Sequence, residues 1–375
     1  MARTAPSAVT EAIGPGQQGA QDGLGGTTAG PADEHLSPLW PFAPGSSPCL
    51  PVRHLVAAAA PGKRRAAGGC AILAAAYRGA MGPELAGREY AGHLTDADLR
   101  LLVSVAAGAA GTGRAADGSW LRGDQAALLA LLEHPGTFDA VMGQGEAAAG
   151  WAGLASPFLV FAVFVQRAAT ELAAAGYVPE RTGPRQRVPL FDAPALRDFL
   201  AEPARRVFLA ELLASFTRVA SGRYRFRAGG RMRTRRFSEL DPVRLAGLLE
   251  AVPRAERPGV YRRLGDVTLF LTGVFPDYAA TVVLGPVNAG RLLRAAGLTP
   301  AQHERLAEAP AIELLEHLGV RWYRAARDLA PVPTARVTVV GEVADRFQQA
   351  RRVLNHIADR YLFPPGSPWF TQPAS

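Results

Sequence analysis

The chain has 375 residues, of which 48% are hydrophobic and 20% are charged, a composition typical of one large or two ordinary globular domains. Its net charge of +8 and pI near 10.0 point to an anionic partner. That inference is weakened because Lys63 is the only lysine, and an excess of Arg, Ala and Gly is also what a GC-rich genome encodes. Cys49 and Cys70 lack metal-ligand spacing and give no disulfide framework, so a reducing compartment is expected.

Neither a signal peptide nor a membrane span is expected from the sequence. The N-terminal segment MARTAPSAVTEAIGPG has no apolar core after its charge. The longest apolar runs, 158–165 and 99–111, are shorter than the ~20 residues that a membrane helix needs. We therefore expect a cytoplasmic protein.

The N-terminal part is expected to contain a disordered tail and then a region of short helices. Residues 1–48 are rich in Gly, Pro, Ala, Ser and Gln, which is typical of disorder. Residues 49–150 are expected to be helical, with a capping-box start at 95–98 and a further helix over 125–132. The Gly-rich run 108–114 follows a helical pattern and lacks the Gly-Lys-Ser/Thr ending of a phosphate loop. We therefore do not expect this run to be a nucleotide-binding loop.

Residues 151–363 are expected to form the main helical domain. Ser156 and Pro157 are typical of an N-cap and first turn, and open a buried helix that runs to about residue 175. Residues 177–194 are expected to be a polar proline loop, and a further helix is expected over 195–220. The loop carries three arginines that either extend the basic surface described next or are ordinary loop charges: Arg181, Arg185 and Arg187.

The arginine-dense segment 222–237, GRYRFRAGGRMRTRRF, is predicted to be a β-hairpin between two helices. The second of these helices is expected to be capped by Asp241 with Pro242 in its first turn. Arginine recurs at every second position on both sides of Gly229 and Gly230, and period two indicates strands. A two-residue loop would place Phe226 opposite Arg233. A three-residue loop would place Phe226 opposite Met232 and gather six arginines on the other face. The apolar pairing favours the three-residue loop.

The hairpin is the candidate anion-binding site. Its proposed residues are Arg223, Arg225, Arg227, Arg231, Arg233 and Arg235. The planar donor fork of arginine suits phosphate and carboxylate, which predicts a platform for a nucleic-acid backbone or an acidic protein. The alternative is a solvated edge whose charges prevent aggregation. Nothing in the segment reads bases, so nucleic-acid binding would be weakly sequence-selective.

The stretch 258–278, PGVYRRLGDVTLFLTGVFPDY, is predicted to be the most apolar helix of the C-terminal half. Gly265, Thr268 and Thr272 form a stripe of small residues that would let another helix approach closely. Asp266 is either paired with Arg262 or Arg263 or is a catalytic carboxylate.

The same stretch carries a resemblance. The segment RRLGDVTLFLTGVFPDY is similar to one in a group of uncharacterised bacterial helical proteins of GC-rich, actinobacterial-like type. The resemblance covers the last third of the chain, and it implies no activity.

The C-terminal part is expected to continue as helices, one from Thr299 and Pro300, one over 312–329 and one over 342–361. The last has an apolar seam with 4-3-4-3-4 spacing, which is either intramolecular core or a self-association surface. The seam consists of Val343, Phe347, Ala350, Leu354, Ile357 and Tyr361. Residues 364–375 are expected to be a loose C-terminal tail.

Motifs for catalysis are missing from the sequence. It has no Gly-x-Ser-x-Gly, no zinc-protease spacing and no nucleotide or flavin fingerprint. The pairs Glu89/His93 and Glu313/His317 each lie one helical turn apart, but a di-iron bundle usually has two Glu-x-x-His pairs. His356 and Asp359 are expected to be solvated. We therefore expect no cofactor and no metal.

These observations favour a mainly α, bundle-like fold with one small β-hairpin, acting as a non-catalytic binding or regulatory adaptor for an anionic partner. Two alternatives remain. One is an unrecognised helical enzyme, including a metal-dependent one, with its site near Asp266 or the Glu/His pairs. The other is a scaffold that self-associates through residues 342–361.

Overall fold

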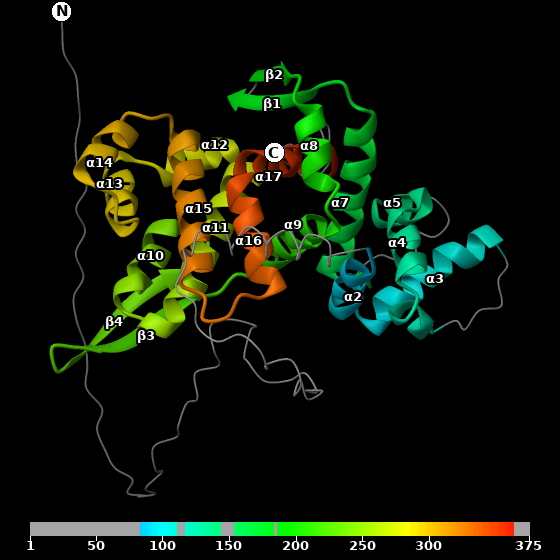
Figure 1. The fold of residues 1–375 in the computed structure, drawn as a ribbon, viewed down its shortest axis with the longest axis horizontal. Coiled ribbons are helices and arrows are strands. Elements are labelled where there is room, and N and C mark those ends of the chain that lie inside the picture. The colour runs from blue at the N-terminus through cyan, green and yellow to red at the C-terminus, as the bar shows by residue number, and fades with distance from the viewer. Residues whose placement is uncertain (1–82, 111–116, 144–153, 184–185, 364–375) are drawn as a thin grey trace, which may run out of the picture. The chain divides into compact units, whose positions relative to one another are not determined.

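The computed structural model describes residues 83–110, 117–143, 154–183 and 186–363, all within the unit formed by residues 60–375 (Figure 1). The predicted mainly α-helical fold is confirmed, because helices fill most of these ranges. The strands within them form two short antiparallel pairs. The tails predicted at 1–48 and 364–375 lie outside the described residues. Residues 111–114 of the Gly-rich run 108–114 also lie outside them.

The first helices are α2 Pro83–His93, α3 Asp96–Ala110, the 3-10 turn η1 Ser119–Arg122, α4 Gln125–Glu133 and α5 Pro135–Val141. Among them, α3, α4 and α5 begin at residues whose side chains cap them. The predicted capping box is present before α3, where the Asp98 N–H donates to the Thr95 hydroxyl and the Thr95 N–H donates to the Asp98 carboxylate. The other Asp98 oxygen accepts a 2.8 Å hydrogen bond from the Ser156 N–H. This contact ties α3 to the start of the next long helix.

That helix, α7 Pro157–Ala174, is an apolar core helix capped by Ser156 as predicted. It packs against α4, α5, α8 Ala193–Leu200 and α9 Pro203–Ser215. Within the described residues it is the one helix long and apolar enough to cross a membrane, and half of it is buried inside the fold, as in a core helix. The single helix predicted over 195–220 is instead α8 and α9, because Pro203 cannot donate a backbone hydrogen bond and starts a new helix.

A second strand pair replaces the loop predicted at 177–194. Strand β1 Val178–Gly183 pairs antiparallel with β2 Gln186–Leu190. The loop prediction was wrong because prolines are tolerated in edge strands, and Pro179 lies opposite Pro189 in a pair that has only edges. The pair packs on α17 Phe347–Ile357, whereas the arginine-rich pair packs on α10 Pro242–Ala246 (Figure 1). Arg187 forms an ion pair with Asp359 at 3.1 Å, and Arg185 lies outside the described residues.

The C-terminal half is organised around α11 Arg257–Val274, which packs against α15 Ala311–Asp328 and α17 (Figure 1). Asp241 caps α10, and Thr299 caps α14 Pro300–Ala307, as predicted. The remaining elements are η2 Gly247–Glu250, η3 Arg254–Glu256, α12 Pro276–Tyr278, the π-turn η4 Ala279–Val283, α13 Pro286–Ala295, α16 Ala335–Asp345 and the π-turn η5 Ala358–Leu362.

The stripe of small residues on α11 lets α15 approach closely, as predicted. A Cβ atom on Gly265 would lie 2.4 Å from the ring of Tyr323 on α15. A Cβ atom on Gly319 of α15 would lie 3.2 Å from the methyl group of Thr268. Glycine is therefore required at position 265 for α11 and α15 to pack at this distance. At position 319 the closest contact of a Cβ atom would be the Phe347 ring of α17, at 2.4 Å.

The predicted helix over 342–361 is interrupted at Arg346, so that α16 ends at Asp345 and α17 begins at Phe347. The seam is nevertheless continuous and faces inward: a Cβ atom on Gly273 of α11 would lie 2.6 Å from Leu354. Its six residues are buried: Val343, Phe347, Ala350, Leu354, Ile357 and Tyr361. The seam is therefore intramolecular core, and these side chains are not exposed for self-association.

Candidate functional site

The arginine-rich segment forms the antiparallel strands β3 Ser221–Ala228 and β4 Arg231–Ser238. Phe226 lies opposite Arg233, so the predicted three-residue loop is wrong. The loop has two residues, Gly229 and Gly230, with φ angles of 58° and 74°. A two-residue hairpin turn needs positive φ at both positions, which glycine adopts without strain. Turn chemistry thus outweighed apolar pairing across the strands.

This register divides the arginines between two faces, so the prediction that six share one face is wrong. The outer face carries six exposed side chains: Arg223, Arg225, Arg227, Met232, Thr234 and Arg236. The inner face carries Tyr224, Phe226, Arg231, Arg233, Arg235 and Phe237. Arg236 was missed because it breaks the period-two pattern of β4. The two-residue turn is the sequence signal that would have placed it opposite Arg223.

The inner face is covered at its base and open near the turn. Phe237 is buried beside α10, and Arg235 pairs with Glu250 at 2.9 Å. Burial, and secondarily the negative charge of Glu256, raise the pKa of Tyr224. In contrast, Arg231 and Arg233 are exposed. Of the predicted set, Arg235 is therefore already neutralised by a neighbour.

The base of the hairpin is held by Glu239, directly after β4. Its carboxylate accepts a 3.0 Å hydrogen bond from the Ala220 N–H and a 2.9 Å hydrogen bond from Arg263 of α11. Arg263 is buried, and its guanidinium carbon lies 4.0 Å from the ring centroid of Phe216. The arginines of the hairpin therefore project from a firmly attached ribbon.

The charge of the hairpin is uncompensated along most of its length. Residues 221–238 contain seven arginines and no acidic residue. Among the residues that the structure describes, Arg235 is the one member of the seven with an ion-pair partner. Arg223 lies directly opposite Arg236, and like charges at opposed positions destabilise a strand pair.

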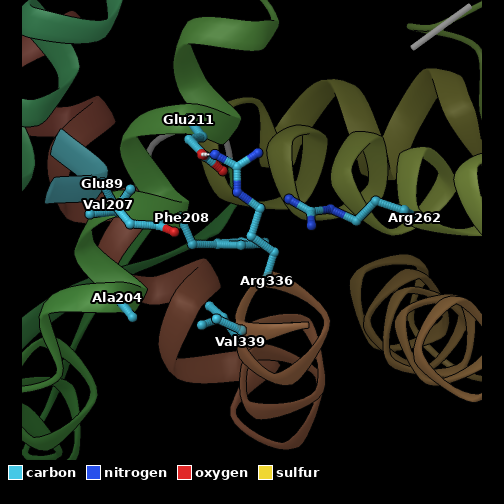
Figure 2. Close-up of a pocket in the computed structure, with 9 residues that line it drawn as sticks. Glu89, Ala204, Val207, Phe208, Glu211, Arg262, Arg336 and Val339 are labelled. Carbon is cyan, nitrogen blue, oxygen red and sulfur yellow. Dashed lines mark ion pairs between the residues drawn. The ribbon is translucent and has the colours of Figure 1, made fainter. Parts of the chain in front are cut away.

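A polar pocket among α2, α9, α11 and α16 is the second candidate (Figure 2). His93 of α2 lies 2.6 Å from Glu211 of α9, and Arg336 of α16 lies 3.5 Å from the same carboxylate oxygen. Figure 2 shows Arg336 reaching toward Glu211, with Arg262 beyond it. The structure thus brings the Glu89/His93 turn close to the helix that carries Asp266.

Asp266 has structural partners on both sides. The Arg262 Nε donates to Asp266 Oδ1 at 2.8 Å, which confirms the predicted ion pair, and the Tyr323 hydroxyl donates to the same oxygen at 2.9 Å. Burial, together with the Asp266 charge, raises the pKa of Tyr323 well above its usual value. Burial lowers the pKa of Arg262, but Asp266, Tyr323 and Glu211 together outweigh that effect and raise it. These contacts account for Asp266 without a catalytic role.

The charge of Glu211 is stabilised by its neighbours. Burial disfavours the charge of Glu211, but the hydrogen bond from His93 and the charges of Arg336 and Arg262 together outweigh burial and lower the pKa of that carboxyl.

The pocket has little room for a substrate. The free space is about 10 Å³, which is room for one water molecule. The pocket is therefore best described as a charge network that joins four helices.

The two other histidines singled out in the sequence, His317 and His356, offer no alternative centre among the described residues. Glu313 and His317 both lie on the exposed side of α15. Partial burial of the His317 ring, together with the charges of Arg321 and Arg324, lowers the pKa of His317. His356 was predicted to be solvated, but it is buried, with its Nε2 3.4 Å from Glu171. In the described ranges, no three His, Cys, Asp or Glu side chains gather in a way that would hold a metal ion.

The two candidates differ in how their charges are used. In the pocket, Glu211 is paired with His93 and Arg336, whereas the hairpin presents arginines to solvent. No protein-family model, curated protein or solved structure matches the chain, so the inference of function rests on this geometry.

Proposed function

We propose that this protein is a non-catalytic binding or regulatory adaptor whose outer hairpin face binds an anionic partner. The observation that carries the proposal is a cluster of four exposed arginines on one face of an anchored ribbon: Arg223, Arg225, Arg227 and Arg236. Guanidinium groups bind phosphate and carboxylate through two parallel hydrogen bonds, so the face suits either chemistry.

Protection of the strand edges alone explains this arrangement poorly. A single charge or a proline is enough to block edge-to-edge pairing. Here Arg223 opposes Arg236, which costs stability unless an anion lies between or beside them. The anchor through Glu239 and Arg263 also holds the face in place before a partner arrives, which reduces the entropy lost on binding.

The pocket supports the enzyme alternative less well. Glu211 of the pocket already binds His93, and Asp266, which does not line the pocket, binds Arg262 and Tyr323. A catalytic acid or base needs a partner on a substrate, and the free space of the pocket holds about one water molecule.

The test is binding to two generic polyanions, a labelled heparin oligosaccharide and a labelled acidic peptide, followed by fluorescence anisotropy. One variant replaces the four outer-face arginines by Gln. A matched control replaces four exposed arginines elsewhere: Arg88, Arg197, Arg291 and Arg305. Both variants lose the same net charge, and circular dichroism verifies their helical content.

We expect the outer-face variant to bind at least one polyanion about 30-fold more weakly than wild type, from four contacts of about 0.5 kcal/mol each. The control variant should stay within a few-fold of wild type. Equal losses in the two variants would show that net charge, and not the hairpin, is responsible, and would refute the proposal.

A further inference from the structure

We infer that the anionic partner is duplex DNA and that the hairpin enters its major groove. This inference rests on the function proposed above and adds the identity of the partner. Its starting point is that the half of the hairpin nearest the turn exposes arginines on both faces. Arg225 and Arg227 lie on the outer face, and Arg231 and Arg233 lie on the inner face.

A two-sided charge distribution selects a two-sided ligand. A flat acidic surface on a protein would contact one face of the ribbon and leave the other pair of arginines in solvent. A duplex groove is flanked by two rows of phosphates, so a ribbon inside it meets negative charge on both sides. Among the described residues, none of these four arginines has an ion-pair partner that would compete.

The dimensions agree with the major groove of B-form DNA. Two paired strands lie about 4.8 Å apart, and the major groove, about 12 Å wide and 8.5 Å deep, admits such a ribbon. The minor groove, about 6 Å wide, is too narrow for a ribbon with arginines on both faces. The major groove of A-form RNA is deep and narrow and is closed to side chains.

The turn is suited to approach the floor of the groove. Gly229 and Gly230 carry no side chain, and a Cβ atom on either would meet nothing within 4 Å. Arg227 and Arg231 flank the turn closely enough to reach base edges, where arginine prefers guanine O6 and N7. Met232, 64% exposed, offers an apolar contact to thymine methyl groups. With so few base contacts, the sequence preference should be modest.

Single-stranded nucleic acid fits this hairpin less well. Proteins that bind single strands stack successive bases on exposed aromatic rings. The aromatic rings of this hairpin, Tyr224 and Phe226, lie half-buried on the inner face and stack on each other at 6.4 Å. They are therefore poorly placed to receive bases.

The deciding experiment compares two double variants on a labelled 20-base-pair DNA duplex across a salt series. Arg225→Gln with Arg227→Gln removes the outer pair, and Arg231→Gln with Arg233→Gln removes the inner pair. With Arg227 and Arg231 on base edges and the other four unpaired hairpin arginines on phosphates, the log-log salt slope of wild type should be about −3.5. Each double variant removes one phosphate contact and should flatten the slope by about 1. Equal effects are expected because the groove has two walls.

The groove itself is tested with the wild-type protein and two further probes. Methylation of guanine N7 should weaken binding, a minor-groove competitor should not displace the protein, and an RNA duplex of the same sequence should bind at least 10-fold more weakly. Displacement by the minor-groove competitor, or equal affinity for the RNA duplex or a single strand, overturns the inference.

The outcomes also separate this inference from the function on which it rests. If only the outer-pair variant loses affinity, the hairpin docks through one face: the groove inference fails and the anion-binding function stands. Preferential binding of the acidic peptide leads to the same conclusion. If wild type binds no duplex, no heparin and no peptide at low salt, both fail.

Discussion

Replacing Gly265 by Ala tests whether the close contact between α11 and α15 organises the C-terminal half. The new Cβ atom would lie 2.4 Å from the ring of Tyr323, which is fully buried and cannot swing aside. Overpacking of this kind costs about 1–3 kcal/mol. Displacement of the ring would also weaken the Tyr323 hydrogen bond to Asp266, worth about 1.5–3 kcal/mol because the acceptor is charged.

Alanine gains about 1 kcal/mol over glycine in a helix interior, which offsets part of this cost. We therefore expect Gly265→Ala to lower the free energy of unfolding by about 1.5–5 kcal/mol, measured by urea unfolding followed by circular dichroism. The control is Gly290→Ala in α13, where a Cβ atom meets nothing within 4 Å and the helix-propensity gain should appear alone. If Gly265→Ala is as stable as wild type, α11 and α15 do not pack as closely as the contact between Gly265 and Tyr323 requires.

Three further outcomes are expected. Asp266→Asn should lower the free energy of unfolding by about 3–5 kcal/mol, because Arg262 loses its counter-charge. Asp345→Asn, at the exposed ion pair with Arg324, should lower it by under about 1 kcal/mol. Comparable losses of stability in the two variants would contradict the argument from burial. The lowered pKa of Glu211 contributes stability above pH 4.5, and this stability is lost as pH falls through the pKa of the folded state. The free energy of unfolding of Glu211→Gln should therefore fall less steeply below pH 4.5 than that of wild type. An unchanged pH profile would refute this reasoning. Arg223→Thr should raise stability by about 0.2–1 kcal/mol in thermal unfolding by relieving repulsion from Arg236, while a loss would argue against the register.

Local signals predicted the helices well because capping and periodicity act over a few residues. Ser156, Asp241 and Thr299 each cap the helix that the sequence assigned to them. Breaks were harder to locate, since the interruption at Arg346 follows no proline or glycine. The β1–β2 pair was missed because its support is distant: Glu180 forms ion pairs with Arg351 and Arg352 on α17.

In the candidate site, too, local sequence signals predicted the secondary structure, and long-range contacts could not be predicted. Period-two spacing was sufficient to predict strands and a turn in the arginine-rich segment. The faces depended on register, where a shift of one residue moves a side chain to the other side. The convergence of His93, Glu211 and Arg336 arises from three helices far apart in sequence, and no local pattern predicts such a meeting.

Helix α17 has a consequence for how the protein is made. Its Arg351 binds Glu180, 171 positions earlier, and its Asn355 donates a hydrogen bond to the Gly273 carbonyl of α11. At about 5–20 residues per second, a ribosome needs roughly 10–30 s to extend the chain from β1 to α17. Throughout that interval the apolar surfaces that α17 later covers have no native partner. The nascent chain should therefore depend on chaperones until α17 emerges.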